Sequence, residues 1–90
     1  MEVDISVHGP MAGKVVRLDT TIRLKPGDTL ARLLSKAGKQ AGVNLLKIIR
    51  KGHVRPVVML CGESLTLPDD LERPLAEGDK VTVLQALGGG

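Results

Sequence analysis

Phenylalanine, tyrosine and tryptophan are all absent from this 90-residue sequence. Proteins that bind single-stranded nucleic acid use aromatic side chains as stacking platforms, so any contact of this chain with nucleic acid would be mainly electrostatic. We therefore do not expect nucleic acid as a partner. The missing aromatic residues also mean that the core must be built from Leu, Val, Ile and Met.

Cysteine and histidine are scarce. Cys61 is the single cysteine and cannot form a disulfide within the chain, and with His8 and His53 it matches no familiar zinc pattern. We expect no metal site, and we interpret Cys61 as a small buried side chain of an apolar strand. Neither histidine has a nearby Ser–Asp or Cys constellation that would make it a base, so both are interpreted as polar loop residues. No catalytic side chain is predicted, and we expect the protein not to be an enzyme.

Long apolar runs are also missing. None approaches the roughly 20 residues that a membrane-spanning helix needs. The first residues, MEVDISV, alternate acidic and apolar side chains and lack the basic and apolar regions of a signal peptide. The length corresponds to one domain. We therefore expect a single cytoplasmic domain with no membrane partner.

Acidic residues are absent from residues 29–62, although the formal net charge of the chain is only +3. The seven basic residues of that segment are Arg32, Lys36, Lys39, Lys47, Arg50, Lys51 and Arg55. Residues 63–90 carry six acidic residues against two basic ones. This asymmetry indicates a basic middle that faces an acidic partner or balances the acidic end of the chain. A solvated helix face and a phosphate-backbone contact are the alternatives.

Apolar and polar residues alternate over 3–7 and again over 14–24, which predicts the two strands of a β-hairpin. The first strand is expected over 3–7 and the second over 14–24, with HGPMAG (8–13) as the loop between them. The last strand is expected in KVTVLQAL (80–87).

A helix is predicted after PGDT, with Asp28 or Thr29 as its N-cap. Its apolar side chains recur at helical spacing and should cover the sheet: Leu30, Leu33, Leu34, Ala37 and Ala41. Gly38 and Gly42 are candidate stops. We expect Asn44 to cap a second short helix ending at Gly52, because continuation through both glycines would cost about 1 kcal/mol for each.

The third quarter of the chain is predicted to hold a central strand, PVVMLC (56–61), covered on both faces because it is apolar throughout. Residues 62–79 are then expected to form a chain of turns. Four leucines should anchor these turns in the core: Leu65, Leu67, Leu71 and Leu75. The elements add up to an α+β domain with a mixed sheet.

The sequence ends in LQALGGG. We expect a folded domain over residues 1–84 and a flexible glycine-rich tail over 85–90, which could extend roughly 20 Å. A terminal carboxylate has a pKa of about 3.3 to 3.7, so it is ionised and can attack the α-phosphate of ATP. Glycine lets the backbone approach a nucleotide closely, since it has no Cβ. A frayed terminus or a cloning remnant is the alternative.

In this order, the features resemble the ubiquitin-like, β-grasp sulfur carriers of the ThiS/MoaD group. The resemblance rests on the hairpin, PGDTLARLL, VVMLCGESL, PLAEGDKVTVL and the glycine terminus, and it spans nearly the whole chain. It implies a β-grasp (ubiquitin-like) fold, with a mixed sheet of four or five strands packed on one main helix plus a short helix. The last strand would run beside the first, in parallel.

The resemblance also implies a function in which the carrier supplies a reactive terminus and no catalytic side chain. An E1-like adenylating enzyme would activate Gly90 with ATP, and a persulfide sulfurtransferase would provide the sulfur that turns it into a thiocarboxylate. A sulfur-acceptor synthase of thiamine, molybdopterin or related biosynthesis would then receive the sulfur. The carrier itself would bind no cofactor. Gly88 and Gly89 would thread into the enzyme, and the expected partner-binding residues are Leu84, Ala86 and Leu87.

Some features depart from the family pattern and leave alternatives open. A third glycine leaves open whether Gly90 or Gly89 is activated, and the basic segment 43–56 leaves the pathway open. One alternative is a ubiquitin-like modifier joined to lysines, or a β-grasp interaction module that is not conjugated. Another is an S4-type RNA-binding domain, which GESLTLPDDLERPLAEGDKVTV resembles.

Overall fold

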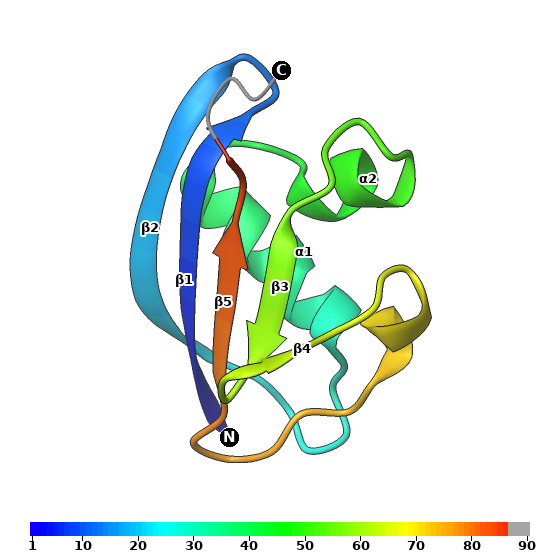
Figure 1. Ribbon diagram of the computed structural model, residues 1–90. Coiled ribbons are helices and arrows are strands. Elements are labelled where there is room, and N and C mark those ends of the chain that lie inside the picture. The colour runs from blue at the N-terminus through cyan, green and yellow to red at the C-terminus, as the bar shows by residue number, and fades with distance from the viewer. Residues whose placement is uncertain (87–90) are drawn as a thin grey trace.

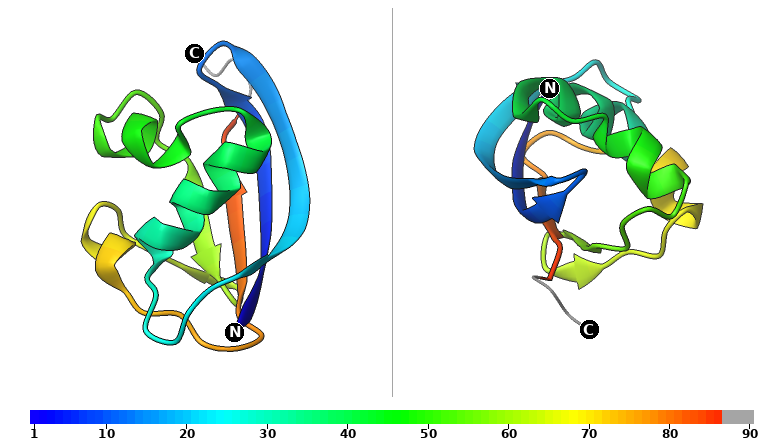
Figure 2. Two further views of the ribbon diagram at one scale, coloured as in Figure 1. Left: turned by 180° about the vertical axis from the view of Figure 1, so that it is seen from behind. Right: turned by 90° about the horizontal axis from the view of Figure 1, so that it is seen from above.

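The computed structural model describes residues 1–86, which form a five-stranded mixed sheet with its helices on one face (Figure 1). The elements in chain order are β1 (Glu2–Met11), β2 (Lys14–Arg23), α1 (Leu30–Ala41), α2 (Leu45–Arg50), β3 (Val57–Leu60), β4 (Glu63–Ser64), the 3-10 helix η1 (Asp69–Glu72) and β5 (Lys80–Leu84). Seen from behind, α1 crosses the back of the sheet (Figure 2). Among the described residues, no helix is long and apolar enough to cross a membrane.

The order of the strands is β2–β1–β5–β3–β4. β1 pairs antiparallel with β2, and β5 lies on its other side in parallel, with Ile5 opposite Val81 and Val7 opposite Val83. A hairpin, a crossing helix and a last strand inserted beside the first make up the β-grasp fold. The predicted fold class is confirmed.

Helix α1 begins and ends as its sequence predicts. The Thr29 side chain accepts a hydrogen bond from the backbone N–H of Arg32 at 3.4 Å, so Thr29 is the N-cap. Asp28 instead closes the preceding turn by accepting from the N–H of Lys25 at 2.9 Å. Gly42, in the left-handed region with φ +76°, ends the helix.

The predicted break between the two helices is confirmed, because Asn44 caps α2 by accepting from the N–H of Lys47 at 3.3 Å. Gly38 does not stop α1 and lies buried within it. A Cβ at Gly38 would come within 2.6 Å of the Val43 carbonyl oxygen and 3.0 Å of the Leu45 nitrogen. Glycine therefore allows the turn into α2 to pack directly on α1.

The core lies between α1 and the inner face of the sheet. It contains no buried polar or charged residue in the part of the chain that is described. The helix contributes four of its five predicted apolar residues as fully buried side chains: Leu30, Leu33, Leu34 and Ala37. The sheet contributes the inward residues of its two parallel strands: Val3, Ile5, Val7, Val81 and Val83. Leu71 and Leu75 are buried as predicted, and Leu65 and Leu67 pack against the core in part.

Three strand predictions are wrong. The last strand, expected over 80–87, is β5 and ends at Leu84. β1 continues through Met11, so residues 8–11 belong to the strand and not to a loop, and the hairpin turns at Ala12 and Gly13. Met11 is 1% exposed, so core packing extends the strand. β5 ends opposite His8, and Pro10, which has no N–H, lies beyond the doubly paired part of β1.

The third error concerns residues 56–61. β3 covers only Val57–Leu60, and helices cover one face of the sheet, so the strand is not covered on both faces. Val57 is 53% exposed. Cys61 lies in the turn after β3 with a φ of +49°, and it is exposed instead of buried.

Candidate functional site

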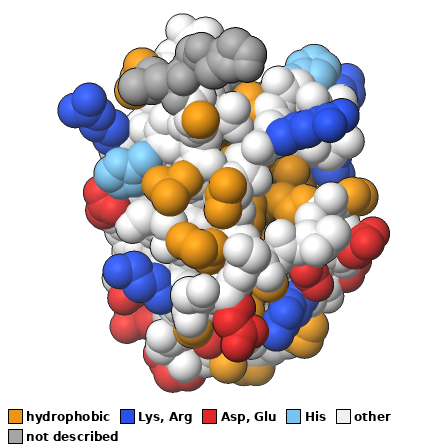
Figure 3. Space-filling view, in the orientation of Figure 1, with side chains coloured by type: hydrophobic (Ala, Val, Ile, Leu, Met, Phe, Trp, Pro, Cys, Tyr) orange, Lys and Arg blue, Asp and Glu red, His pale blue; other side chains and the backbone are white. Residues whose placement is uncertain are grey.

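The outer face of the sheet carries the large apolar side chains that are exposed among residues 1–86, which are Val15, Val57 and Leu84. Val57 of β3 lies opposite Leu84 of β5, and Met59 is next along the same face, opposite Thr82. Val57 is 53% and Leu84 is 43% exposed. Figure 3 shows apolar side chains gathered in the middle of this face. We call Val57, Met59 and Leu84 the Leu84 patch.

His8 borders the Leu84 patch on the side of β1. It lies opposite Leu84 in the parallel pairing and opposite Arg17 in the hairpin. A shallow cavity of about 280 Å³ lies here, lined by His8, Gly9, Val15, Arg17, Leu84 and Gln85. Val15 is 57% exposed, so it extends the apolar surface to the edge strand. The cavity therefore continues the Leu84 patch across the end of β5.

The carboxylate of Asp19 holds the polar side chains of this border together. Ser6 Oγ donates to Asp19 Oδ1 at 2.6 Å, and His8 Nε2 lies 3.0 Å from both oxygens of the same carboxylate. The Ser6 hydrogen bond, followed by the one to His8, holds the pKa of Asp19 below its ordinary value of 3.8. Because Ser6 and His8 both contact Asp19, this differs from a triad in which the histidine accepts the serine proton.

The end of β5 is fixed to β1 by the backbone. The N–H of Gln85 donates to the carbonyl of His8 at 2.9 Å. Gly9 has a φ of +129°, and a Cβ there would overlap the carbonyl of Gln85. The chain can therefore leave the sheet at this point only because residue 9 has no side chain. Gln85 Oε1 is buried and has no hydrogen-bond partner among the described residues.

Comparison with known proteins finds a likeness among solved structures. No family model matches the chain, and no curated protein matches it. Among solved structures, it is similar to a ubiquitin-like protein from the hyperthermophilic archaea Caldiarchaeum subterraneum. The two share 19% sequence identity, with 99% of this chain and 100% of that chain covered and a TM-score of 0.45. The fold assignment rests on the strand order and pairing described above.

Of the predicted partner-binding residues, Leu84 and Ala86 are exposed at the end of β5. Leu87, Gly88, Gly89 and Gly90 lie outside the described residues. The division of the chain at residue 84 and the partner-binding role stay predictions.

Sequence reasoning missed Val57, Val15 and the Ser6–His8–Asp19 cluster. Val57 belongs to an apolar run that resembles a buried strand, so the exposure of its side chain was not predicted. The cluster depends on the hairpin register, which places Asp19 opposite Ser6 and 13 residues away in sequence. A strand prediction extended to Met11 could have found it, since His8 and Ser6 then share a face at period 2.

The other candidate residues lie apart from this site. Cys61 Sγ is 3.6 Å from Asp79 Oδ1, at the turn that follows β3. Residues 1–86 contain no group of three or more His, Cys, Asp or Glu side chains that could hold a metal ion. The bases at the end of the basic segment are all exposed: Lys47, Arg50, Lys51 and Arg55.

Proposed function

We propose that this protein is a ubiquitin-like sulfur carrier. The carboxylate of Gly90 attacks the α-phosphorus of ATP on an E1-like enzyme and displaces pyrophosphate. The outer sulfur of a persulfide on the sulfurtransferase then displaces AMP and forms an acyl disulfide. A second cysteine thiol of the partner enzymes attacks the sulfurtransferase sulfur, forms a protein disulfide and releases the thiocarboxylate, which serves a synthase of thiamine, molybdopterin or related biosynthesis. ATP and the catalytic side chains belong to the partner enzymes.

The observation that supports the proposal best is where β5 ends. This strand lies in the middle of the sheet, in parallel with β1, and is followed directly by the residues that lead to the three glycines. Its last residue, Leu84, belongs to an apolar surface that extends over Val57 and Val15. An exposed apolar patch of this kind is typical of a protein-binding surface. A partner that docks here would lie next to the start of the tail.

A ubiquitin-like modifier or a β-grasp interaction module is the second candidate, favoured by the same fold and the same exposed patch. These roles differ in the chemistry of the terminus. A carrier ends as a thiocarboxylate, a modifier becomes joined to lysines of other proteins, and a module keeps a free carboxylate. The S4-like alternative has lost its support, because the segment that suggested it forms β4, η1 and β5 of the β-grasp domain.

Intact-mass spectrometry of the protein purified from its own host tests the proposal. A thiocarboxylate adds about 16 Da to the carboxylate form, since sulfur replaces one oxygen. We expect this species, and we expect alkylation to add two labels to it, one on Cys61 and one on the thiocarboxylate, against one on the carboxylate form. A carboxylate form alone, or the chain attached to lysines of other proteins, would contradict the sulfur-carrier proposal. The same spectrum identifies the last residue of the mature chain.

A further inference from the structure

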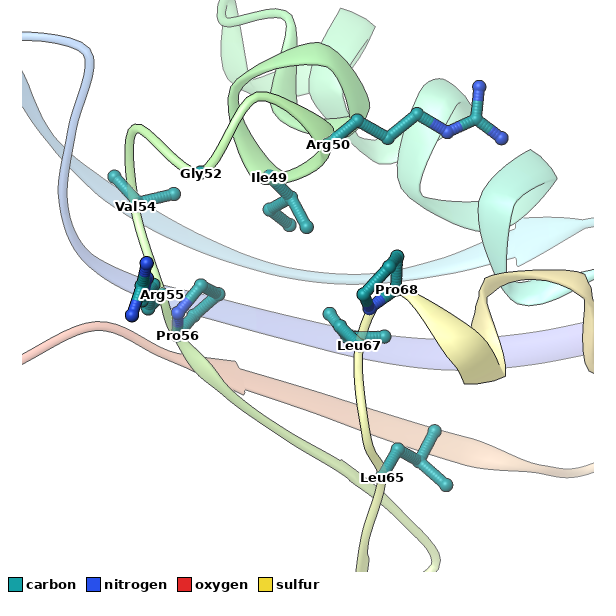
Figure 4. Close-up of a pocket in the computed structure, with 9 residues that line it drawn as sticks. All are labelled: Ile49, Arg50, Gly52, Val54, Arg55, Pro56, Leu65, Leu67 and Pro68. Carbon is teal, nitrogen blue, oxygen red and sulfur yellow. The ribbon is translucent and has the colours of Figure 1, made fainter.

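A second surface feature lies at the other edge of the sheet, between α2 and the segment that joins β4 to η1 (Figure 4). It is a cleft of about 370 Å³ lined by six apolar residues together with Arg50, Gly52 and Arg55. The apolar residues are Ile49, Val54, Pro56, Leu65, Leu67 and Pro68. Ile49 is only 8% exposed and is the most buried of them, whereas Leu65 and Leu67 are half-buried. One bulky apolar side chain entering the cleft would therefore be covered from both sides.

Two arginines lie at the rim of this cleft, which we call the basic cleft. Figure 4 shows Arg50 extending away from the apolar residues, while Arg55 lies beside Pro56 on another part of the rim. Lys47 and Lys51 add positive charge from the same helix and its end. Residues 29–62 hold no acid, so this side of the cleft is uniformly basic.

The acidic residues of η1 on the opposite side are Asp69, Asp70 and Glu72, and within residues 1–86 only Glu72 pairs with an arginine of the cleft. Arg50 Nη2 is 3.4 Å from Glu72 Oε1, with the two side chains 51% and 76% exposed. An exposed pair at this distance contributes little, so an incoming carboxylate can replace it. Asp70 accepts a hydrogen bond from the N–H of Thr66 at 2.7 Å, so its carboxylate stabilises the loop that leads into η1. Arg55 forms no ion pair within residues 1–86.

We propose that the basic cleft is a docking site for a short acidic segment of a partner protein. The segment carries one bulky apolar side chain, which enters the cleft beside Ile49 and Leu67. Flanking Asp or Glu residues pair with Arg50 and Arg55, whose planar guanidinium groups bind carboxylates in a fork. Apolar burial then supplies affinity, and the charges supply specificity and a faster association.

The chemistry of the residues that line the basic cleft favours an acidic peptide over RNA. RNA recognition uses stacking on aromatic side chains as well as phosphate contacts. The apolar residues of the basic cleft are aliphatic, and the chain has no aromatic residue at all. An aliphatic lining with a basic rim matches a peptide that is both apolar and acidic.

The proposal does not depend on the sulfur-carrier role, because it involves neither the tail nor ATP. The experiment is a selection of peptides from a random displayed library on the full-length protein. The selected peptides are then synthesised, labelled and measured by fluorescence anisotropy. We expect them to share one bulky apolar residue flanked by acids, and we expect their affinity to fall as salt rises.

Matched variants assign the binding to the cleft. Arg50→Gln combined with Arg55→Gln should weaken the selected peptides about tenfold or more. The control, Arg32→Gln with Lys39→Gln, removes the same charge from exposed positions of α1 and should change affinity less than about twofold. Leu67→Ser should also weaken binding, provided that its melting curve shows a folded protein. Amide chemical shifts should move within residues 49–56 and 65–68.

Several results would overturn the proposal. They are selection of no peptide, selection of peptides without acids, equal affinity in both double variants, or shifts confined to the Leu84 patch. Tight binding of a labelled RNA hairpin that is lost with Arg50→Gln and Arg55→Gln, while the α1 control keeps it, would assign the cleft to nucleic acid instead.

Discussion

The carbonyl of Gln85 occupies the space in which a side chain of residue 9 would lie, and the N–H of Gln85 donates to the neighbouring carbonyl of His8 at 2.9 Å. Gly9 and Gln85 thus fix where the chain leaves the sheet. The φ of +129° at Gly9 is one that side chains with a Cβ rarely adopt. The fold therefore requires glycine at residue 9, directly beside the Leu84 patch.

Gly9→Ala should therefore destabilise the fold by about 3 kcal/mol, since it adds backbone strain and disturbs the hydrogen bond of Gln85. Gly13→Ala is the matched control. Gly13 also has a positive φ, +79°, but a Cβ there would meet no atom within 4 Å. It should cost only about 1 kcal/mol. Urea denaturation measures both, and equal losses of stability would show that the approach of Gln85 is unimportant.

Substitutions in the Leu84 patch should weaken binding of the proposed E1-like enzyme without unfolding the protein. Leu84→Ser and Val57→Ser each remove an exposed apolar side chain, so we expect about tenfold weaker binding from each and a stability change within about 1 kcal/mol. Lys80→Ser, at the opposite end of the same strand and face, is the control. Calorimetric titration of the enzyme with each variant is the measurement. Wild-type affinity in both patch variants would place the interface elsewhere.

The pKa of Asp19 should respond to both Ser6 and His8, because the Ser6 hydrogen bond is the largest single cause of its lowered value and His8 adds a hydrogen bond and an electrostatic attraction. Ser6→Ala and His8→Gln should each raise the pKa of Asp19 toward 3.8. Carboxyl carbon chemical shifts followed through an acid titration measure both changes. An unchanged pKa of Asp19 in Ser6→Ala would contradict this assignment.

The same shift gives a pH dependence with a definite sign. A carboxyl whose pKa is lower in the folded state stabilises the fold above its unfolded pKa, and this contribution is lost as the pH falls through the folded value. The stability difference between wild type and Asp19→Asn should therefore shrink as the pH falls below 3.8. A difference that grows as the pH falls below 3.8 would contradict the sign.

Much of the fold could be predicted because local signals and long-range packing agree. Thr29 and Asn44 are good N-caps, and both cap a helix in the structure. The alternation in residues 3–7 and the leucine stripe of α1 each specify a single buried face, so the sheet and its covering helix followed from periodicity. The position of β5 beside β1 came from the family resemblance.

The errors share a physical cause, which is that the deciding contacts are distant in sequence. Gly9 and Pro10 resemble loop residues locally, but Met11 and Gln85 hold them in the strand. Val57 and Cys61 belong to an apolar run, and only the one-sided cover of the sheet reveals that they are exposed. The candidate site combines β1, β2, β3 and β5, so its full extent required the register between strands.

Deletion of Gly88, Gly89 and Gly90 should separate stability from function. All strands and all buried residues of the described part precede Gln85, so the deletion should change the free energy of unfolding by only a few tenths of a kcal/mol. The same deletion should abolish ATP–pyrophosphate exchange by the cognate E1-like enzyme, because it removes the reacting carboxylate. Equal exchange from the full-length and shortened proteins would refute the proposed carrier role.

Three further variants locate the reacting group within the tail. Gly89→Val keeps the terminal carboxylate but adds a branched side chain where the backbone must approach the nucleotide closely, so exchange should fall. An alanine added after Gly90 keeps all three glycines and moves the carboxylate by one residue, about 3.5 Å, which should also reduce exchange. Removal of Gly90 alone decides between the two glycines that the sequence left open. If Gly90 is activated, this variant should lose exchange. If trimming to Gly89 precedes activation, it should match or exceed the full-length protein.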